Sequence, residues 1–275
     1  MMDGRAGSVG RMRHAISLPP FGELSDPNVV VDIAVAAEET GWDAVFVWDH
    51  LLRPVEQATL IADPWVTMTA IAMKTSRVRI GPMVTPIARR RPLKLAREVA
   101  TLDMASKGRL TLGLGLGVDS GGELTRTGEE LDPKVRGSML DEGVRLLDQM
   151  LRGEHVVHSG VHYMVDGITL APTGVQRPRV PFWLATRGDK LAPVRRAARY
   201  EGLCPTVITP DRLGELVDFV AAERGSLDGY DFAIMITPEH ALADFERRGA
   251  TWAVHEMQPH NTVAEIMHEI ATGLG

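Results

Sequence analysis

Cysteine is nearly absent from this 275-residue chain, which contains only one, Cys204. A single cysteine excludes a disulfide framework and any zinc site built from several cysteines. Long apolar runs are also missing, since none approaches the roughly 18 residues that a membrane-spanning helix needs, and we expect no membrane partner. Cys204 falls in a strand that we expect to be buried, which favours a core residue over a nucleophile.

Positive charge is in the minority. The chain carries 30 Lys and Arg residues against 36 Asp and Glu residues, a formal net charge of −6. Nucleic acid binding requires a dominant basic face, so we expect no nucleic acid partner. Residues 1–12 are polar and glycine-rich and lack the apolar segment of a secretory signal. We therefore expect a cytoplasmic protein with a flexible leader over residues 1–12, or a native start at Met12, and a single domain over residues 13–275.

The rest of the chain alternates short apolar strands with longer helical segments. Asp-Pro pairs and a closing glycine, Gly41, supply the helix start and stop signals of the first helices. The expected strands are His14–Leu18, Ala44–Trp48, Val78–Val84, Arg109–Leu116, Pro181–Ala185, Leu203–Val207, Asp231–Ile236 and Thr251–His255. The expected helices are Pro27–Thr40, Pro64–Lys74, Pro92–Ala105, Val135–Leu151, Leu191–Tyr200, Pro210–Arg224, Pro238–Arg248 and Thr262–Ala271.

These strand–helix units predict an α/β protein with a single (β/α)8 TIM barrel. Eight such units in about 250 residues match the size of that closed barrel. The alternative is an open doubly wound sheet, which normally has fewer strands and a glycine loop after the first strand, where this chain has Pro19-Pro20. We expect two additions to the barrel. A hairpin insertion, Glu154–Pro172 with its turn at Ser159-Gly160, precedes the fifth strand, and a long loop, Gly117–Pro133, follows the fourth.

Barrel active sites lie at the C-terminal ends of the strands, where polar side chains occur in this chain. Asp49-His50 closes the second strand, and a carboxylate can orient a histidine that exchanges protons near neutral pH. A helix-capping aspartate beside a surface histidine is the alternative. The run Arg89–Arg91 is either an anion site or a solvated charge run. Thr186, Arg187 and Gly188 precede a helix, which suits a phosphate, although a structural role is equally open.

Glycines and histidines elsewhere leave further alternatives. Gly113, Gly115 and Gly117 do not form the G-x-G-x-x-G motif, so they either admit a flat ligand close to the backbone or serve barrel packing. His255 lies on the last strand, where it could reach the mouth of the pocket, although a structural role is the one we expect. The hairpin contains His155, His158 and His162 without a carboxylate pattern, and we expect no metal there.

Four blocks of the chain together resemble the luciferase-like monooxygenase family of flavin- and deazaflavin-dependent oxidoreductases. The blocks are Gly41–Leu52, Arg77–Gly117, Arg136–Leu151 and Arg177–Gly188. The resemblance implies a (β/α)8 barrel that binds FMN or coenzyme F-420 at the C-terminal strand ends. It also implies catalytic roles for Asp49 and His50, with the histidine near the reactive edge of the deazaflavin in members that use F-420.

The resemblance further implies where the cofactor would lie. Members often carry a non-proline cis peptide in a bulge that ends the third strand, which maps near Pro82-Met83-Val84 and presses backbone against the central ring. The residues implied to contact the ring and the phosphate of the cofactor are Met83, Val84, Thr85, Leu116, Gly117, Thr186, Arg187 and Gly188.

Two positions depart from the family pattern. Some F-420-dependent dehydrogenases place a glutamate directly after the fourth strand, where this chain has Val118, with Glu123 several residues later. This change weakens the expectation of a mechanism like that of the sugar-phosphate dehydrogenases. The family's usual tryptophan near the sixth strand is replaced by Gly202-Leu203-Cys204.

The expected function is that of an oxidoreductase or monooxygenase. It would use reduced FMN with O2, or coenzyme F-420, to oxidise or reduce a small organic substrate. A flavin reductase or F-420 reductase would supply the reduced cofactor. We expect a homodimer, and the Gly117–Pro133 loop is the expected lid. The alternatives are a non-catalytic flavin-binding or partner subunit on the same barrel, and a metal-dependent barrel hydrolase.

Overall fold

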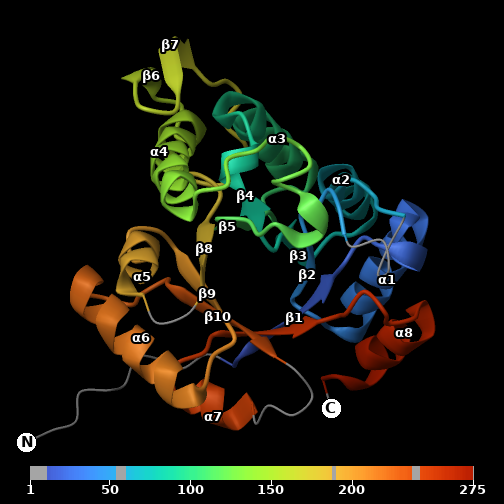
Figure 1. The fold of residues 1–275 in the computed structure, drawn as a ribbon. Helices are drawn as coiled ribbons and strands as arrows, with labels where there is room; N and C mark the ends of the chain where they lie inside the picture. The colour runs from blue at the N-terminus through green and yellow to red at the C-terminus, as the bar shows by residue number, and fades with distance from the viewer. Residues whose placement is uncertain (1–10, 54–59, 188–189, 237–241, 275) are drawn as a thin grey trace, which may run out of the picture.

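The computed structural model describes residues 11–53, 60–187, 190–236 and 242–274 of the chain. Its parallel strands form one sheet that curls into a barrel with the helices outside (Figure 1). The order of strands in the sheet is β3-β2-β1-β11-β10-β9-β8-β5-β4. These strands are β1 (Arg13–Leu18), β2 (Ala44–Val47), β3 (Arg79–Pro82), β4 (Thr85–Pro86), β5 (Leu112–Gly115), β8 (Phe182–Arg187), β9 (Gly202–Thr206), β10 (Asp231–Ile236) and β11 (Trp252–Glu256).

The two ends of this sheet meet and close the barrel. β4 pairs with β5, and an isolated parallel bridge joins Ile80 of β3 to Leu110, just before β5. β3 and β4 are two halves of the third strand predicted from the sequence, and the cis peptide Met83-Val84 separates them. The predicted (β/α)8 barrel is therefore confirmed, with its third strand broken at the bulge that the family resemblance implies.

The helices follow the strands in the expected order. Asp26 and Asp63 cap the first two by accepting hydrogen bonds from the N–H groups of Asn28 and Val66, and Gly41 ends the first at φ 96°. The predicted helix Pro238–Arg248 is described only as α7, because residues 237–241 lie outside the described part of the chain. The helices are α1 (Pro27–Thr40), α2 (Pro64–Lys74), α3 (Pro92–Ala105), α4 (Pro133–Leu151), α5 (Leu191–Ala197), α6 (Pro210–Arg224), α7 (Leu242–Arg247) and α8 (Val263–Thr272).

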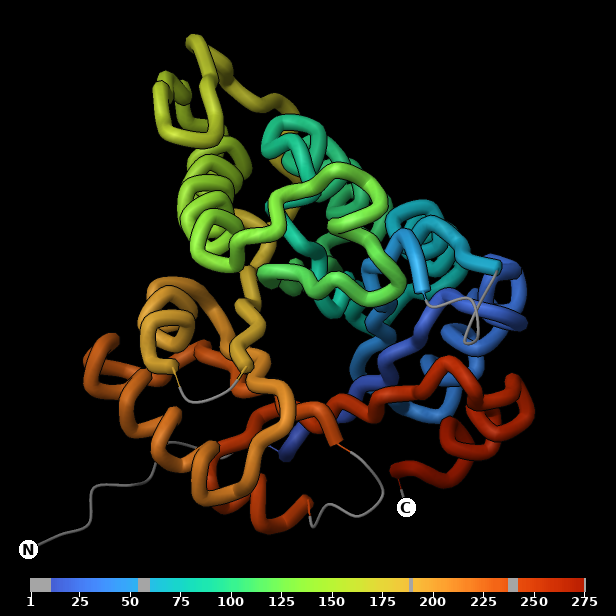
Figure 2. The backbone as a smooth tube through the Cα atoms, in the orientation of Figure 1, coloured from blue at the N-terminus to red at the C-terminus, as the bar shows by residue number. Residues whose placement is uncertain are grey.

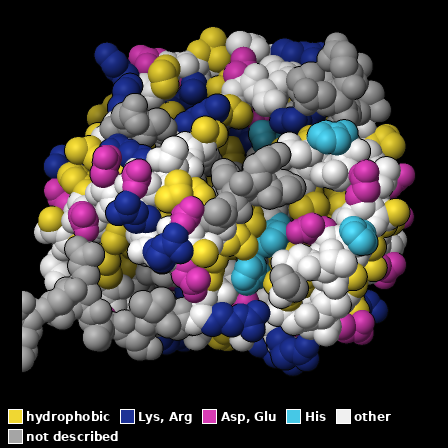
Figure 3. All heavy atoms as spheres, turned by 90° about the horizontal axis from the view of Figure 1, so that it is seen from below, with side chains coloured by type: hydrophobic (Ala, Val, Ile, Leu, Met, Phe, Trp, Pro, Cys, Tyr) yellow, Lys and Arg dark blue, Asp and Glu magenta, His cyan; other side chains and the backbone are white. Residues whose placement is uncertain are grey.

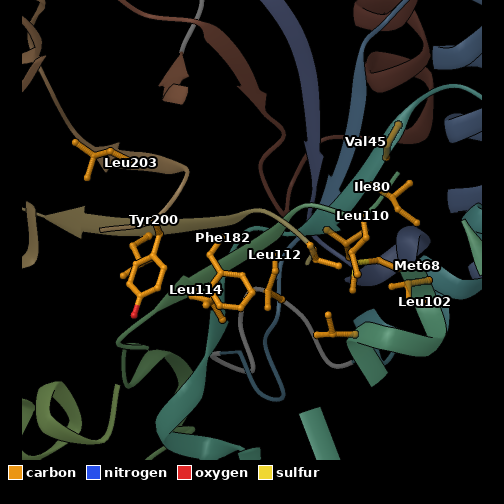
Figure 4. Close-up of a cluster of buried hydrophobic side chains, with 14 of the residues drawn as sticks. Val45, Met68, Ile80, Leu102, Leu110, Leu112, Leu114, Phe182, Tyr200 and Leu203 are labelled. Atoms are coloured by element: carbon orange, nitrogen blue, oxygen red, sulfur yellow. The ribbon is translucent and has the colours of Figure 1, made fainter. Parts of the chain in front are cut away.

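Two hydrophobic layers hold the barrel together. The larger layer lies between strands and helices, and its buried cluster includes Ile80 and Leu112 of the strands with Met68 of α2 and Leu102 of α3 (Figure 4). The smaller layer fills the barrel interior and contains Ala15, Ala44, Phe46, Met83, Trp183, Cys204, Ala233, Trp252 and Val254. Burial raises the pKa of the Cys204 thiol, and its place in this interior layer confirms it as a core residue.

The hairpin insertion before the fifth barrel strand is confirmed, but its turn was predicted wrongly. It consists of β6 (His155–Ser159) and β7 (Met164–Thr169), which project from the barrel next to α4 (Figure 1). Residues 160–163 form the turn, and the N–H of Gly160 donates to the carbonyl of Tyr163. The turn is longer than the predicted Ser159-Gly160 because Glu142 of α4 accepts hydrogen bonds from the N–H groups of His162 and Tyr163 and holds the loop open.

The three hairpin histidines contact separate partners. His158 contacts Glu142 at 2.9 Å, His162 contacts Ser138 at 3.0 Å, and His155 contacts Thr169 at 3.1 Å. Within the described ranges, no group of three His, Cys, Asp or Glu residues is arranged to hold a metal ion.

Charge and hydropathy on the outside of the barrel agree with the composition. On the face drawn in Figure 3, Asp and Glu side chains are interspersed with Lys and Arg, and neither sign covers that face. No helix in the described part of the chain is both long and apolar enough to span a bilayer. Met12 was predicted to be part of a flexible leader, which is wrong, because Met12 is 5% exposed and packs in the core. Residues 1–10 of the predicted leader lie outside the described residues.

Candidate active site

Asp49 lies at the centre of a hydrogen-bond cluster at the C-terminal end of β2. The strand ends at Val47, which frees Asp49 and His50 from strict alternation across the sheet. The Asp49 carboxylate is buried and accepts hydrogen bonds from Arg90 at 2.6 and 2.8 Å and from the Thr85 hydroxyl at 2.6 Å. The indole N–H of Trp65, on α2, donates to it at 3.1 Å. Asp49 therefore joins the ends of β2 and β4 to α2.

His50 forms a pair with Glu123, which the structure brings from the long loop after β5. The Nδ1 atom of His50 lies 3.0 Å from Oε1 of Glu123. Because Glu123 is ionised, Nδ1 is the donor, and the neutral ring then carries its lone pair on Nε2. Among the described residues, Nε2 has no hydrogen-bond partner, and the side chain is 18% exposed. The pair therefore presents one oriented imidazole nitrogen at the barrel mouth.

Glu123 is held in place more tightly than the histidine. Its side chain is 1% exposed, and Oε1 also accepts hydrogen bonds from the N–H groups of Leu51 at 2.6 Å and Leu52 at 3.0 Å. Burial acts to raise the pKa of Glu123, but the contacts with His50 and the Leu52 N–H outweigh burial and hold that pKa below its usual value. The carboxylate is therefore a fixed negative charge beside the imidazole.

The loop after β5, drawn in green in Figure 2, packs on the segment that follows β2. The Arg53 guanidinium donates to the Ser120 hydroxyl at 3.0 Å. At Gly121, where φ is 73°, an added Cβ would lie 2.5 Å from the Arg53 carbonyl carbon. This close approach requires glycine and lets Glu123 reach the N–H groups after His50.

The arginine run after β4 is neither of the two alternatives that the sequence left open for it. Arg90 pairs with Asp49, and the Arg89 guanidinium donates to the Asp49 carbonyl at 3.1 Å and lies 3.6 Å from Glu123. The Arg89 side chain is 3% exposed, and its Nε and Nη1 atoms have no partner among the described residues. Only Arg91 is exposed to solvent. Two of the three arginines thus neutralise the buried carboxylates of the site.

The implied ring-binding residues gather at the ends of β3, β4 and β5. Met83 is buried in the barrel interior, and Val84 follows it across the cis peptide. The Thr85 side chain is already bonded to Asp49, which leaves its backbone for a ligand. Leu116 is half-buried, and Gly117 adopts a φ of 77° beside Pro86, where an added Cβ would lie 2.8 Å from that ring.

The alternating glycines of β5 serve barrel packing, which decides between the two alternatives. A Cβ on Gly113 would lie 2.3 Å from the Pro82 carbonyl oxygen, and one on Gly115 would lie 2.5 Å from a Val84 methyl. Protein atoms therefore fill the space that a flat ligand would have needed. The glycines allow β5 to approach the bulge between β3 and β4 closely.

The implied phosphate-binding residues lie at the end of β8. Leu184 of β8 is in register with Leu114 of β5, so Thr186 lies beside the end of β5. Thr186 is buried, Arg187 is exposed at the end of the strand, and Gly188 lies outside the described residues. The residues implied to bind the ring and those implied to bind the phosphate thus lie at neighbouring strand ends, of β5 and β8.

His255 bonds to neighbouring side chains of α8 and β1, as expected for a structural residue. It contacts Glu269 of α8 at 2.7 Å and His14 of β1 at 3.2 Å in the layer between barrel and helix. Burial lowers the pKa of both histidines from the ordinary value of 6.5.

The sequence did not predict the partners of Glu123 and Arg89, although both residues were noted in it. Glu123 lies 73 positions from His50, and nothing local to its glycine-rich loop marks it as a histidine partner. Its one signal is that it is an acidic residue in the loop after the strand where some dehydrogenases place a glutamate. For Arg89 the sequence left open an anion site or a solvated charge run, because burial cannot be read from three consecutive arginines.

Known proteins resemble this chain along most of its length. A family model for luciferase-like monooxygenases matches residues 9–266. An F420-dependent glucose-6-phosphate dehydrogenase of Nakamurella multipartita is 33% identical over 233 residues, which cover 80% of this chain and 65% of that protein. The oxygenase component of a flavin-dependent trigonelline monooxygenase of Acinetobacter baylyi is 27% identical over 186 residues, which cover 68% of this chain and 49% of that protein. The chain thus spans about half to two thirds of the length of these curated relatives.

Solved structures show the same barrel. An F420-dependent secondary alcohol dehydrogenase in complex with an F420-acetone adduct superimposes with a TM-score of 0.80 at 18% identity, and the match covers 94% of this chain and 96% of that one. A likeness at this identity concerns the fold alone. Together with the family match over residues 9–266, it confirms the resemblance in the four sequence blocks: the chain belongs to the luciferase-like monooxygenase family.

Proposed function

We propose that this chain is an oxidoreductase that uses coenzyme F-420, with His50 as the catalytic proton donor or acceptor. The pair of His50 and Glu123 is the observation that carries the proposal, because it presents an oriented imidazole at the barrel mouth. The relatives named F420-dependent glucose-6-phosphate dehydrogenases support the choice of cofactor. The substrate class we propose is a small organic alcohol or its carbonyl counterpart.

The residues at the mouth fit a planar cofactor that carries several carbonyl groups. The buried Nε and Nη1 atoms of Arg89 have no partner among the described residues, while its Nη2 atom contacts the backbone carbonyl of Asp49 and the carboxylate of Glu123. The exposed Arg187 and the buried Thr186 at the end of β8 suit a phosphate group on the same edge. Coenzyme F-420, when bound, supplies hydride transfer of two electrons.

His50 handles the proton that accompanies the hydride. An alcohol that loses a hydride from carbon must also lose its hydroxyl proton to become a carbonyl compound. Nε2 of neutral His50 can accept that proton, and the Glu123 carboxylate then stabilises the resulting imidazolium at 3.0 Å. In the reverse direction the protonated ring donates to the carbonyl oxygen.

We assign Asp49 a positioning role. Its carboxylate is buried and already accepts from Arg90, Thr85 and Trp65, so it orients the residues around the bulge instead of contacting substrate. The ring would then lie against Met83, Val84 and the backbone of Thr85, with Leu116 and Gly117 beside it. Thr186, Arg187 and Gly188 would bind the phosphate.

The second candidate is a monooxygenase that uses reduced FMN and O2. The relative named as the oxygenase component of a trigonelline monooxygenase favours it, and a separate flavin reductase would then supply the reduced flavin. If the cofactor is F-420, an F-420-reducing enzyme would supply the reduced cofactor instead. The non-catalytic subunit on the same barrel is disfavoured by the intact pair of His50 and Glu123.

Titration with both cofactors tests the proposal. We expect the purified protein to bind coenzyme F-420 more tightly than FMN. Absorbance and fluorescence of the cofactors monitor the binding. With F-420 bound and a panel of small alcohols and ketones, His50→Gln should lower turnover by about 100-fold or more while leaving the fold intact by circular dichroism. His155→Gln, on the exposed hairpin strand, is the matched control.

Two outcomes would contradict the proposal. Selective FMN binding with O2-dependent turnover would replace it with the monooxygenase. Unchanged turnover of His50→Gln would remove the catalytic role of the histidine.

The homodimer and the cytoplasmic location remain predictions. Val66 and Met73, seven positions apart on α2, are 65% and 68% exposed, which supports an interface on that helix. Analytical ultracentrifugation tests the oligomeric state directly.

A further inference from the structure

Arg89 is a buried cation of the active site whose hydrogen bonding is incomplete. Its Nη2 atom contacts the Asp49 carbonyl at 3.1 Å and the Glu123 carboxylate at 3.6 Å. Its Nε and Nη1 atoms are buried without a partner among the described residues, and the side chain is 3% exposed. Burying unbonded donors costs free energy. The position of Arg89 therefore indicates a role for its charge.

The two carboxylate oxygens of Glu123 face different partners. Oε1 lies 3.0 Å from Nδ1 of His50 and accepts hydrogen bonds from the N–H groups of Leu51 and Leu52. Oε2 faces Nη2 of Arg89 at 3.6 Å, which is too long for a hydrogen bond. One carboxylate thus lies between the imidazole and the guanidinium, and Arg89 acts on it through charge.

The buried charges of the site balance. The carboxylates of Asp49 and Glu123 are buried and contribute two negative charges. Arg89 and Arg90 contribute two positive charges, so the sum of the four groups is zero. A proton added to His50 would leave a positive charge without a counter-charge beside this cluster, which disfavours the imidazolium. Without Arg89 the cluster would carry one negative charge, which would favour it.

Three further charged side chains lie on or beside the same loop. Arg53 is half-buried, and its guanidinium lies 5.3 Å from the ring centroid of Phe21, which in turn lies 6.0 Å from that of His50. Asp119 and Arg126 are exposed, where water and salt screen their charges. All three remain in place when Arg89 is substituted, so a comparison of Arg89 variants isolates the buried guanidinium.

We propose that Arg89 is a positioning residue that keeps His50 neutral until the substrate proton is transferred to it. The proposal rests on the proposed function, in which neutral His50 accepts the hydroxyl proton of an alcohol. Arg89 draws on the negative charge of Glu123, the partner that stabilises the imidazolium. The same attraction contributes to the lowered pKa of Glu123 and so keeps this carboxyl ionised.

NMR titration of the histidine ring protons in the cofactor-free protein tests the proposal. The signal of His50 is identified by its loss in His50→Gln. In Arg89→Gln the midpoint of the His50 titration should rise by about one pH unit, because loss of a nearby positive charge stabilises the imidazolium. Arg89→Lys, which keeps the charge, should restore a midpoint close to that of the wild type. Arg91→Gln removes an exposed arginine of the same run and is the matched control.

The pH dependence of turnover provides a second measurement. With F-420 and an alcohol, the pH of half-maximal oxidation should move upward in Arg89→Gln, because only the neutral ring accepts a proton. Glu123→Gln should move it downward, since that substitution removes a negative charge instead. Opposite shifts from the two substitutions support the charge balance, and a merely structural role of Arg89 predicts lower turnover without a shift.

The results separate this proposal from the proposed function. An unshifted His50 titration in folded Arg89→Gln would overturn the role of Arg89, even where F-420 binds and His50→Gln is inactive. A shifted titration supports that role, even where F-420 gives no turnover. Arg89→Met, which fills the space without a charge, replaces Arg89→Gln if circular dichroism shows that the glutamine variant does not fold. If neither variant folds, the wild-type titration decides, and a His50 ring mostly protonated at pH 7 would overturn the proposal.

Discussion

At the scale of single residues, close approach of backbone segments explains why glycine is required at several positions and how Glu123 reaches His50. Gly113 and Gly115 let β5 lie against the bulge between β3 and β4, and Gly121 lets the following loop reach the end of β2. Glu123 depends on that approach for its contact with His50. The functional geometry of the site therefore rests on positions where a methyl group would not fit.

Substitution of Gly115 tests this directly. Gly115→Ala should destabilise the protein by about 1–3 kcal/mol, because the new methyl overlaps the Val84 side chain and the closed barrel leaves little room to relax. Gly137→Ala is the matched control: it lies within α4, its added Cβ meets only the end of Arg196 at 3.9 Å, and it should be neutral or stabilising. Urea denaturation of both variants provides the measurement. Equal effects of the two substitutions would be inconsistent with the packing role.

Removal of the Glu123 charge tests its positioning role. Glu123→Gln keeps an acceptor for the Leu51 and Leu52 N–H groups but removes the negative charge 3.0 Å from His50. Turnover should fall by about 10- to 100-fold, by analogy with other groups that orient a reacting histidine. The pH–rate profile should shift toward lower pH, because an imidazolium beside a neutral amide is less stable. An unshifted profile would mean that Glu123 serves only the loop.

At the scale of elements, loops and strand ends carry the site, and the helices brace them. Trp65 of α2 donates to Asp49, and Glu269 of α8 contacts His255 on β11. The caps and apolar stripes of these helices were predictable, because they depend on residues within one or two turns. Helix-to-strand partners were not, since they depend on how each helix packs against the barrel.

The histidine contacts between β1, β11 and α8 predict a pH dependence of stability. Burial lowers the pKa of His14 and His255 from 6.5, while Glu269 acts to raise that of His255. The unfolded state therefore binds protons more readily than the folded state. The free energy of unfolding should be constant above about pH 6.5 for these groups and should decrease as the pH falls below it.

Denaturant titrations at a series of pH values measure this effect. His14→Gln should flatten the decrease, whereas His155→Gln, on the exposed hairpin, should leave it unchanged. A wild-type free energy of unfolding that rises on acidification would contradict the assignment.

At the scale of the whole molecule, the first and last strands are neighbours. β1 pairs with β11 from Arg13↔Trp252 to Ser17↔Glu256, so the sheet is complete only when both ends of the chain are in place. Parallel strands also bring every C-terminal strand end to one mouth, which places His50 and Thr186 on the same side of the barrel. The opposite end carries the first residues of the strands, among them Arg13, Arg79 and Asp231.

Truncation tests the dependence on the last strand. A chain ending at Arg248 lacks β11 and α8, exposes the edges of β1 and β10, and should lose cooperative thermal unfolding. A chain ending at Leu274, which keeps α8 and the packing of Leu274 on the core, should unfold like the full-length protein. Circular dichroism melting compares the two chains, and cooperative unfolding of the shorter one would show that the barrel tolerates an open edge.

The sequence by itself determined the alternation of strands and helices, the barrel, the two additions to it, the family, and the placement of Asp49-His50 at a strand end. These features depend on local periodicity, capping residues and contiguous motifs. Only the tertiary structure decided that Glu123 orients His50, that Arg89 and Arg90 pair with buried carboxylates, that the β5 glycines serve packing, and that His255 contacts α8. Such contacts join residues dozens of positions apart. The distances between these residues are set by the register of the strands and the path of the loops, which no local sequence pattern encodes.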